Sequence, residues 1–94
     1  MVKVEWAADA LADLDRFATF LQEQHPFLAK LVANELIDKV EMLSRHPRLG
    51  RAIAGSMQYR QLVVRALNAS YVVQYRFDGS RVVVLRVLHG RERR

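Results

Sequence analysis

The chain has 94 residues, of which 51% are apolar and 27% are charged, and it contains no cysteine. A chain of this length buries enough surface for one hydrophobic core, which indicates a single domain over residues 1–94 and excludes a second. Without cysteine there is no disulfide framework and no thiolate metal site, and this composition is typical of a cytoplasmic protein. No apolar run approaches the ~18 residues of a membrane-spanning helix, so we expect no membrane partner.

The positive charge is concentrated in the second half of the chain. Residues 1–47 contain eight acids and five bases, whereas residues 48–94 contain two acids and ten bases, and all ten are arginine. Guanidinium groups bind carboxylate or phosphate through paired hydrogen bonds, so this half is predicted to contact an anionic partner, either an acidic protein segment or a nucleic acid. A genome that favours arginine codons would explain arginine in place of lysine, but not its restriction to one half.

The first half of the chain predicts a strand and two helices. Residues 2–6 alternate apolar and polar side chains, as a half-buried strand does. Apolar residues then recur every three or four positions from Ala7 to Glu23, and again from Pro26 to about His46, which predicts two amphipathic helices. The connection at residues 24–26 is so short that the helices should pack antiparallel as a hairpin.

The second half predicts a sheet. Residues 47–56 contain a proline and two glycines and are expected to form a loop. Three segments rich in Val, Tyr and Leu follow, at Tyr59–Ala66, Tyr71–Phe77 and Arg81–Leu88, and they predict an antiparallel meander. The expected fold is therefore α+β: a strand, a two-helix hairpin and a three-stranded meander, with the helices packed on one face of the sheet.

The register of the last hairpin has two alternatives. A two-residue turn at Asp78–Gly79 would oppose Arg76 and Arg81, which is unfavourable. We expect the other alternative, a three-residue loop over Asp78–Ser80, because burial of one face dictates register. That loop sets three pairs side by side: Tyr75 and Val83, Val73 and Leu85, and Tyr71 and Val87.

The sequence contains few candidates for catalysis. His25, His46 and His89 lie in separate contexts, and no glycine-rich phosphate loop or Gly-x-Ser-x-Gly turn is present, so no metal and no cofactor is expected. The exception is the C-terminal cluster of Arg86, His89, Arg91, Arg93 and Arg94. An imidazole that titrates near neutrality beside phosphate-binding arginines suits metal-free RNA cleavage, whereas the plainer alternative is a basic tail without a catalytic role.

Several motifs occur in an order and spacing that is familiar. They are a leading Val-x-Trp strand, Ala-x-x-Asp-Leu on the first helix, Leu-x-x-x-Pro-x-x-Gly-Arg at Leu43–Arg51, Arg60-Gln61-Leu62, Tyr71-x-x-x-Tyr75-Arg76, and Val84-Leu85-Arg86-Val87-Leu88-His89-Gly90-Arg91. Together they cover almost the full length, and the chain resembles the ParE branch of the ParE/RelE toxin superfamily.

This resemblance implies a cytoplasmic toxin of a type II toxin–antitoxin system. Its expected partner is a ParD-like antitoxin whose acidic tail wraps the toxin in a hetero-oligomer. ParE-like members are associated with poisoning DNA gyrase, whereas RelE-like relatives cleave messenger RNA on the ribosome. A third alternative is a chain that has lost toxicity and only binds its antitoxin.

The two toxin branches differ at positions that this sequence contains. RelE-like nucleases usually have an arginine after the tyrosine that corresponds to Tyr71, and here that residue is Val72. They often have a tyrosine near the C-terminus, which is missing here, and His89 is followed by Gly90 and not by a tyrosine. The resemblance thus favours a gyrase inhibitor that acts by binding, with no catalytic residues. Its target-binding residues would be Arg60, Arg86, His89 and Arg91, and the alternative is an endoribonuclease that uses Arg60, His89 and Arg91 for catalysis.

Overall fold

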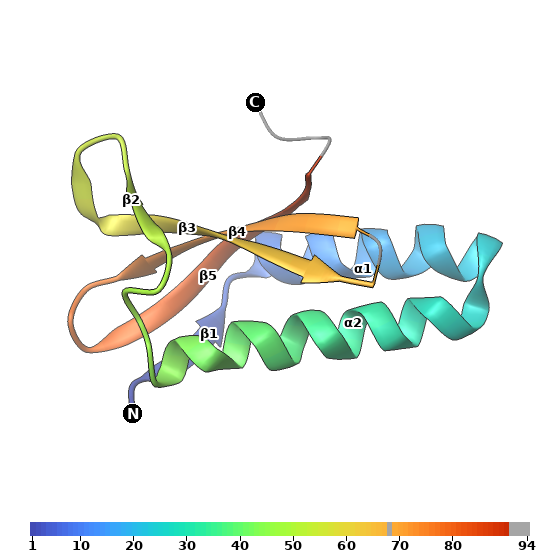
Figure 1. Cartoon of the computed structure of the whole chain (residues 1–94), viewed down its shortest axis with the longest axis horizontal. Coiled ribbons are helices and arrows are strands. Elements are labelled where there is room, and N and C mark those ends of the chain that lie inside the picture. The colour runs from blue at the N-terminus through green and yellow to red at the C-terminus, as the bar shows by residue number, and fades with distance from the viewer. Residues whose placement is uncertain (68, 91–94) are drawn as a thin grey trace.

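A computed structural model describes residues 1–67 and 69–90. The elements in chain order are β1 (Lys3–Trp6), α1 (Ala8–Gln24), α2 (Pro26–Glu41), a short 3₁₀ turn η1 (Met42–Ser44), β2 (Arg51–Ile53), β3 (Ser56–Ala66), β4 (Ala69–Phe77) and β5 (Arg81–His89). The strands form one sheet in the order β1-β5-β4-β3-β2, and both helices lie against one face of it (Figure 1). The predicted α+β architecture with a helical hairpin over a meander is confirmed.

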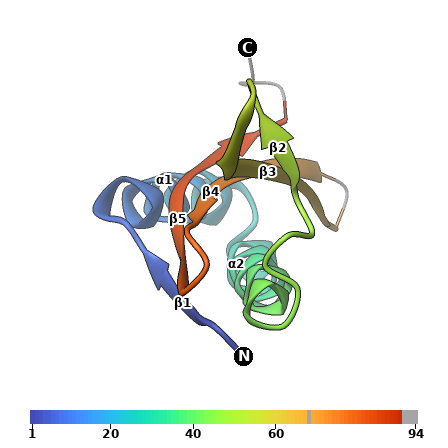
Figure 2. The same ribbon diagram turned by 90° about the vertical axis from the view of Figure 1, so that its left-hand side faces the viewer.

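The helical hairpin forms where the apolar spacing predicts it. Pro26 occupies the first turn of α2, where its missing N–H breaks no helical hydrogen bond. The second helix ends at Glu41 and continues only as the single turn η1, so the predicted helical end near His46 is too late. Viewed end-on, α1 lies beside β5 and α2 lies below β3 and β4 (Figure 2). In the described part of the chain, no helix is both long enough and apolar enough to cross a membrane.

The core lies between this hairpin and the inner face of the sheet. Apolar residues with at most 1% exposure come from both helices, η1 and the strands β3, β4 and β5: Ala10, Leu36, Val40, Leu43, Ala66, Val73, Tyr75, Val82, Val84 and Val87. The alternation along β4 places Tyr71, Val73, Tyr75 and Phe77 on this inner face, as expected for a half-buried strand.

The predicted register of the last hairpin is wrong. Tyr75 pairs with Val84, Val73 with Val87 and Tyr71 with His89, and a bulge lies between Gln74 and Tyr75. The Asp78 carboxylate accepts hydrogen bonds from the backbone N–H groups of Ser80 and Arg81, so the turn extends one residue further than expected. The bulge then returns the apolar side chains in the rest of β5 to the inner face of the sheet. A strict two-residue alternation does not predict such a bulge.

Two strand pairings were not predicted from the sequence pattern. β1 runs parallel to β5, with Lys3 paired to Arg81 and Trp6 to Val84, so the first strand joins the last. β2 pairs antiparallel with β3 inside the segment that was expected to be a loop. Both strands are short, and the pairing of each depends on a neighbour that the local pattern does not identify.

Candidate functional site

Arg60 lies inside the protein, although it was expected to contact a target. Only 8% of the residue is exposed, and it lies opposite Tyr75 on the inner face of the sheet. Its Nη1 donates to the carbonyl of Gly50 at 2.7 Å and to that of Arg48 at 3.4 Å, while its buried Nε has no hydrogen-bond partner among the described residues. The guanidinium group therefore ties the segment before β2 to the sheet.

Tyr75 holds the same segment from the next strand. Its hydroxyl donates to the carbonyl of Pro47 and accepts from the N–H of Gly50, each at 2.8 Å. Burial raises the pKa of Tyr75, and the Gly50 hydrogen bond and the charge of Arg60 offset part of that rise. A Cβ on Gly50 would lie 2.7 Å from the Gln61 carbonyl oxygen and 2.8 Å from the tyrosine ring, so this position requires glycine. The proline and glycine of the Leu43–Arg51 motif thus have a structural role.

Arg86 is bound to a carboxylate of α1. Its Nε and Nη2 donate to the two oxygens of Asp13 at 2.7 and 3.0 Å, and the N–H of Val87 donates to Asp13 Oδ2 at 2.8 Å. Burial alone would raise the pKa of Asp13, but the hydrogen bonds from Arg86 and Val87, with the charges of Arg86 and Arg16, lower it below its usual value. The Asp13 carboxylate thus accepts a backbone hydrogen bond from β5, as a carbonyl of a neighbouring strand would.

His89 belongs to an aromatic cluster at the end of β5. Its ring centroid lies 5.4 Å from that of Tyr71 and 6.5 Å from that of Phe17, both in edge-on geometry. Burial raises the pKa of Tyr71. Arg16 of α1 places its guanidinium carbon 4.9 Å from the centroid of the Phe17 ring. The imidazole therefore packs against apolar and aromatic side chains of α1 and β4.

The structure describes three of the four predicted target-binding residues, and it does not gather these three into one group. Arg86 and His89 lie on β5 beside α1, whereas Arg60 is on β3. Arg60 pairs with Tyr75 and His89 with Tyr71, so the two are offset by four residues of β4, or roughly 13 Å of strand. Arg91 lies outside the described residues.

A second set of arginines was missed by the sequence analysis. Arg48 and Arg51 are exposed, and Arg76 is half-buried on the neighbouring strand. The guanidinium carbon of Arg48 lies 5.0 Å from the centroid of the Phe77 ring, and Arg76 Nε donates to Gln58 Oε1 at 3.0 Å. We name Arg48, Arg51 and Arg76 the hairpin arginines, because they surround the β2–β3 hairpin. The signal in the sequence was the charge of the second half, which gave no indication of which arginines would meet.

The comparisons with known proteins identify the family. A family model described as the ParE toxin of the type II toxin-antitoxin system, parDE, matches residues 4–94. The chain belongs to this family of ParE toxins. The toxin is 33% identical over 94 residues to Toxin RelE3 of Caulobacter vibrioides, with both chains fully covered, and 31% identical over 85 residues to Toxin RelE1 of the same organism, with 90% of this chain and 89% of the relative covered.

A solved structure supports the fold. It is described as the chromosomal ParDE TA system from P. aeruginosa, and it matches with a TM-score of 0.77 at 20% identity, covering 95% of the toxin and 96% of the other chain. At that identity the likeness concerns the fold alone. The resemblance inferred from the sequence motifs is thereby confirmed at the level of the family and the architecture.

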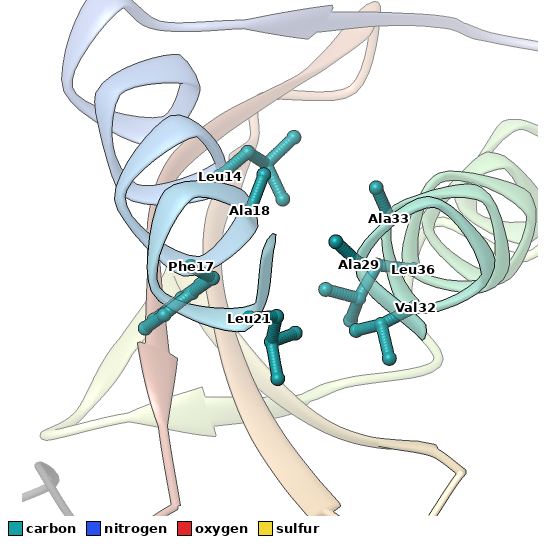
Figure 3. A pocket seen from close by; sticks show the side chains of 8 residues that line it. All are labelled: Leu14, Phe17, Ala18, Leu21, Ala29, Val32, Ala33 and Leu36. Atoms are coloured by element: carbon teal, nitrogen blue, oxygen red, sulfur yellow. The ribbon is translucent and has the colours of Figure 1, made fainter. Parts of the chain in front are cut away.

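The space between the two helices of the toxin is apolar and narrow. Leu14, Ala18 and Leu21 of α1 point towards Ala29, Val32, Ala33 and Leu36 of α2 (Figure 3). The free space is about 10 Å³, which is at the lower limit for one water molecule. This gap has no room for a small-molecule ligand, and within residues 1–67 and 69–90 no group of three His, Asp or Glu side chains is placed to hold a metal ion.

Proposed function

We propose that this toxin inhibits DNA gyrase by binding, and that it does so in the cytoplasm without cleaving RNA. The main support is how the residues needed for cleavage are used. Arg60, one of the three candidates for cleavage, is buried and its Nη1 donates to the Gly50 carbonyl. RelE-like nucleases usually have an arginine at the position of Val72. Here that residue is a valine and is 2% exposed.

This arrangement disfavours general acid–base catalysis on a phosphodiester. Such a reaction needs a base, an acid and a cation within hydrogen-bond reach of one reacting phosphate. The offset of four residues between the partners of Arg60 and His89 on β4 separates two of the three candidates. Binding, in contrast, needs only a complementary surface.

A supercoiling assay tests the proposal. Purified toxin added to gyrase and relaxed plasmid is expected to block supercoiling or to trap cleaved DNA. Normal supercoiling at a large molar excess of folded toxin would contradict it. If expression of the toxin also fails to arrest growth, the result would support the third alternative, a chain that only binds its antitoxin.

The names of the relatives favour one other candidate function, a ribosome-dependent endoribonuclease. Toxin RelE3, at 33% identity, and Toxin RelE1 have names from that branch. Mapping of transcript ends after induction decides between the two functions. Cuts at fixed codon positions that disappear in His89→Gln but persist in His25→Gln, a matched change in the connection between the helices, would establish cleavage.

We further propose that an antitoxin with an acidic tail neutralises the toxin in a hetero-oligomer. The outer face of the sheet offers exposed apolar groups, among them Val63 at 58% exposure, close to arginines of the basic half. Apolar anchors flanked by charge are typical of surfaces that bind amphipathic segments. Val63→Glu should weaken antitoxin binding at least about ten-fold, or ~1.4 kcal/mol. Phe27→Glu, at an exposed position on α2, is the matched control and should leave binding unchanged.

A further inference from the structure

The β2–β3 hairpin projects from the body of the toxin. In Figure 1 it rises beyond the sheet on the side opposite the connection between α1 and α2, and Figure 2 shows it as a narrow two-stranded ribbon. Its turn residues, Ala54 and Gly55, both have positive φ, as tight hairpin turns of type I′ require. The hydroxyl oxygen of Ser56 accepts from the N–H groups of Gln58 and Tyr59 at 3.3 and 3.4 Å, which holds the start of β3 in place.

The base of this ribbon has positive charge without matching carboxylates. Within the described residues, 1–67 and 69–90, the basic members of the ion pairs are Arg16, Lys39, Arg81 and Arg86. None of these pairs includes a hairpin arginine. Arg76 does help to lower the pKa of Asp78, to about 2, but after the larger effect of the Ser80 and Arg81 hydrogen bonds that this carboxylate accepts. The charge of the hairpin arginines is therefore available to an external anion.

The ribbon also presents neutral groups that form paired hydrogen bonds. Gln61 is half-buried beside Arg51 in the β2–β3 register, whereas Gln58 is exposed and its amide oxygen accepts from Arg76 Nε. Tyr59, with 45% exposure, lies between them on the same strand. Glutamine amides pair with the edge of adenine, and arginines pair with phosphates or with guanine.

The shape of this region favours one class of anionic partner. An acidic peptide that added a strand to the β2 edge of the sheet would have only the three residues of β2 to pair with, whereas the β2–β3 hairpin projects from the body of the toxin as a narrow two-stranded ribbon (Figures 1 and 2). The major groove of B-form DNA is about 12 Å wide and admits a two-stranded ribbon. The corresponding groove of double-stranded RNA is too narrow for side chains to read.

We infer that the β2–β3 hairpin of this toxin inserts into the major groove of duplex DNA, with the hairpin arginines on the flanking phosphates. The inference goes beyond the proposed function, because it requires neither gyrase nor an antitoxin. For a toxin that traps cleaved DNA, it adds a direct contact with the substrate of its target.

Fluorescence anisotropy with a labelled DNA duplex of about 20 base pairs tests the inference. Three phosphate contacts predict a slope of log K against log salt of about −2.7. The double variant Arg48→Gln/Arg51→Gln should bind at least about ten-fold more weakly at low salt. Because it lacks two phosphate contacts, its slope should be shallower by roughly 1.8. The control Lys30→Gln/Arg45→Gln has the same net charge as the double variant and should stay within about two-fold of the wild type, because its positions, on α2 and just after η1, lie outside the hairpin.

Each other outcome overturns the inference. Equal losses in both double variants would mean diffuse attraction by net charge, and equal binding to a duplex RNA of the same sequence would contradict the groove argument. Binding of polyglutamate that is as tight and as sensitive to Arg48→Gln/Arg51→Gln would assign the surface to an acidic peptide. Circular dichroism confirms that each variant is folded, and Arg51→Gln alone serves if the double variant is not. Gyrase inhibition without DNA binding would overturn this inference and leave the proposed function standing.

Discussion

Replacement of Asp13 by alanine should destabilise the toxin more than the loss of any other acidic side chain in the described residues. The Asp13 side chain is 4% exposed and accepts from Arg86 Nε, Arg86 Nη2 and the Val87 N–H. Alanine removes all three acceptor contacts at once. It leaves the Arg86 guanidinium and the Val87 N–H without this acceptor where α1 packs against β5.

The magnitude follows from what each donor loses. A buried backbone N–H without a partner costs ~1–3 kcal/mol, and loss of one member of a fully buried ion pair costs ~3–5 kcal/mol. The Arg86 side chain is 42% exposed, so water can solvate its guanidinium group and the ionic part shrinks well below that range. We expect Asp13→Ala to lower the free energy of unfolding by about 3 kcal/mol.

Thermal and urea denaturation, followed by circular dichroism, measure this difference. For a domain of this size, a loss of about 3 kcal/mol lowers the Tm by roughly 12–24 °C. Asp15→Ala, an exposed position on the same helix, is the matched control and should change the stability by less than about 0.5 kcal/mol. If the two variants have equal stability, the carboxylate of Asp13 does not hold β5 and the reasoning fails.

Three further predictions concern stability. The unfolded chain has the ordinary Asp pKa of 3.8, and the folded pKa of Asp13 is lower, so its contribution is complete above pH 3.8 and is lost as the pH falls through the folded pKa. The difference in unfolding free energy between wild type and Asp13→Asn should therefore shrink in acid, and a difference that grows would contradict this sign. Tyr75→Phe leaves the Gly50 N–H without its partner and should cost ~1–3 kcal/mol in urea denaturation, whereas Tyr59→Phe, at an exposed position, should be neutral. Ala54 has φ 47°, so Ala54→Asn should raise the unfolding free energy by roughly 0.5 kcal/mol, and a lower Tm would show that the turn is unstrained.

The sequence by itself determined the elements that depend on local periodicity. The three-and-four spacing in α1 and α2 and the alternation in β4 reflect which side chains face a core, and they are legible without knowing what covers them. The short connection before Pro26 sufficed to predict the helical hairpin. The order and spacing of the motifs also sufficed to identify the family.

Interactions between distant residues were decided only by the tertiary structure. Asp13 lies on α1, whereas its partner Arg86 lies on β5, 73 positions later in the chain. The bulge beside Tyr75, the pairing of β2 and the burial of Arg60 likewise depend on which strand or loop lies alongside. Charge and hydropathy are properties of single residues, whereas an ion pair, a register and a buried cation are properties of the neighbours that folding brings together. For this reason the sequence predicted a surface rich in arginine, and only the structure decided which guanidinium groups are buried, which are paired and which surround the projecting hairpin.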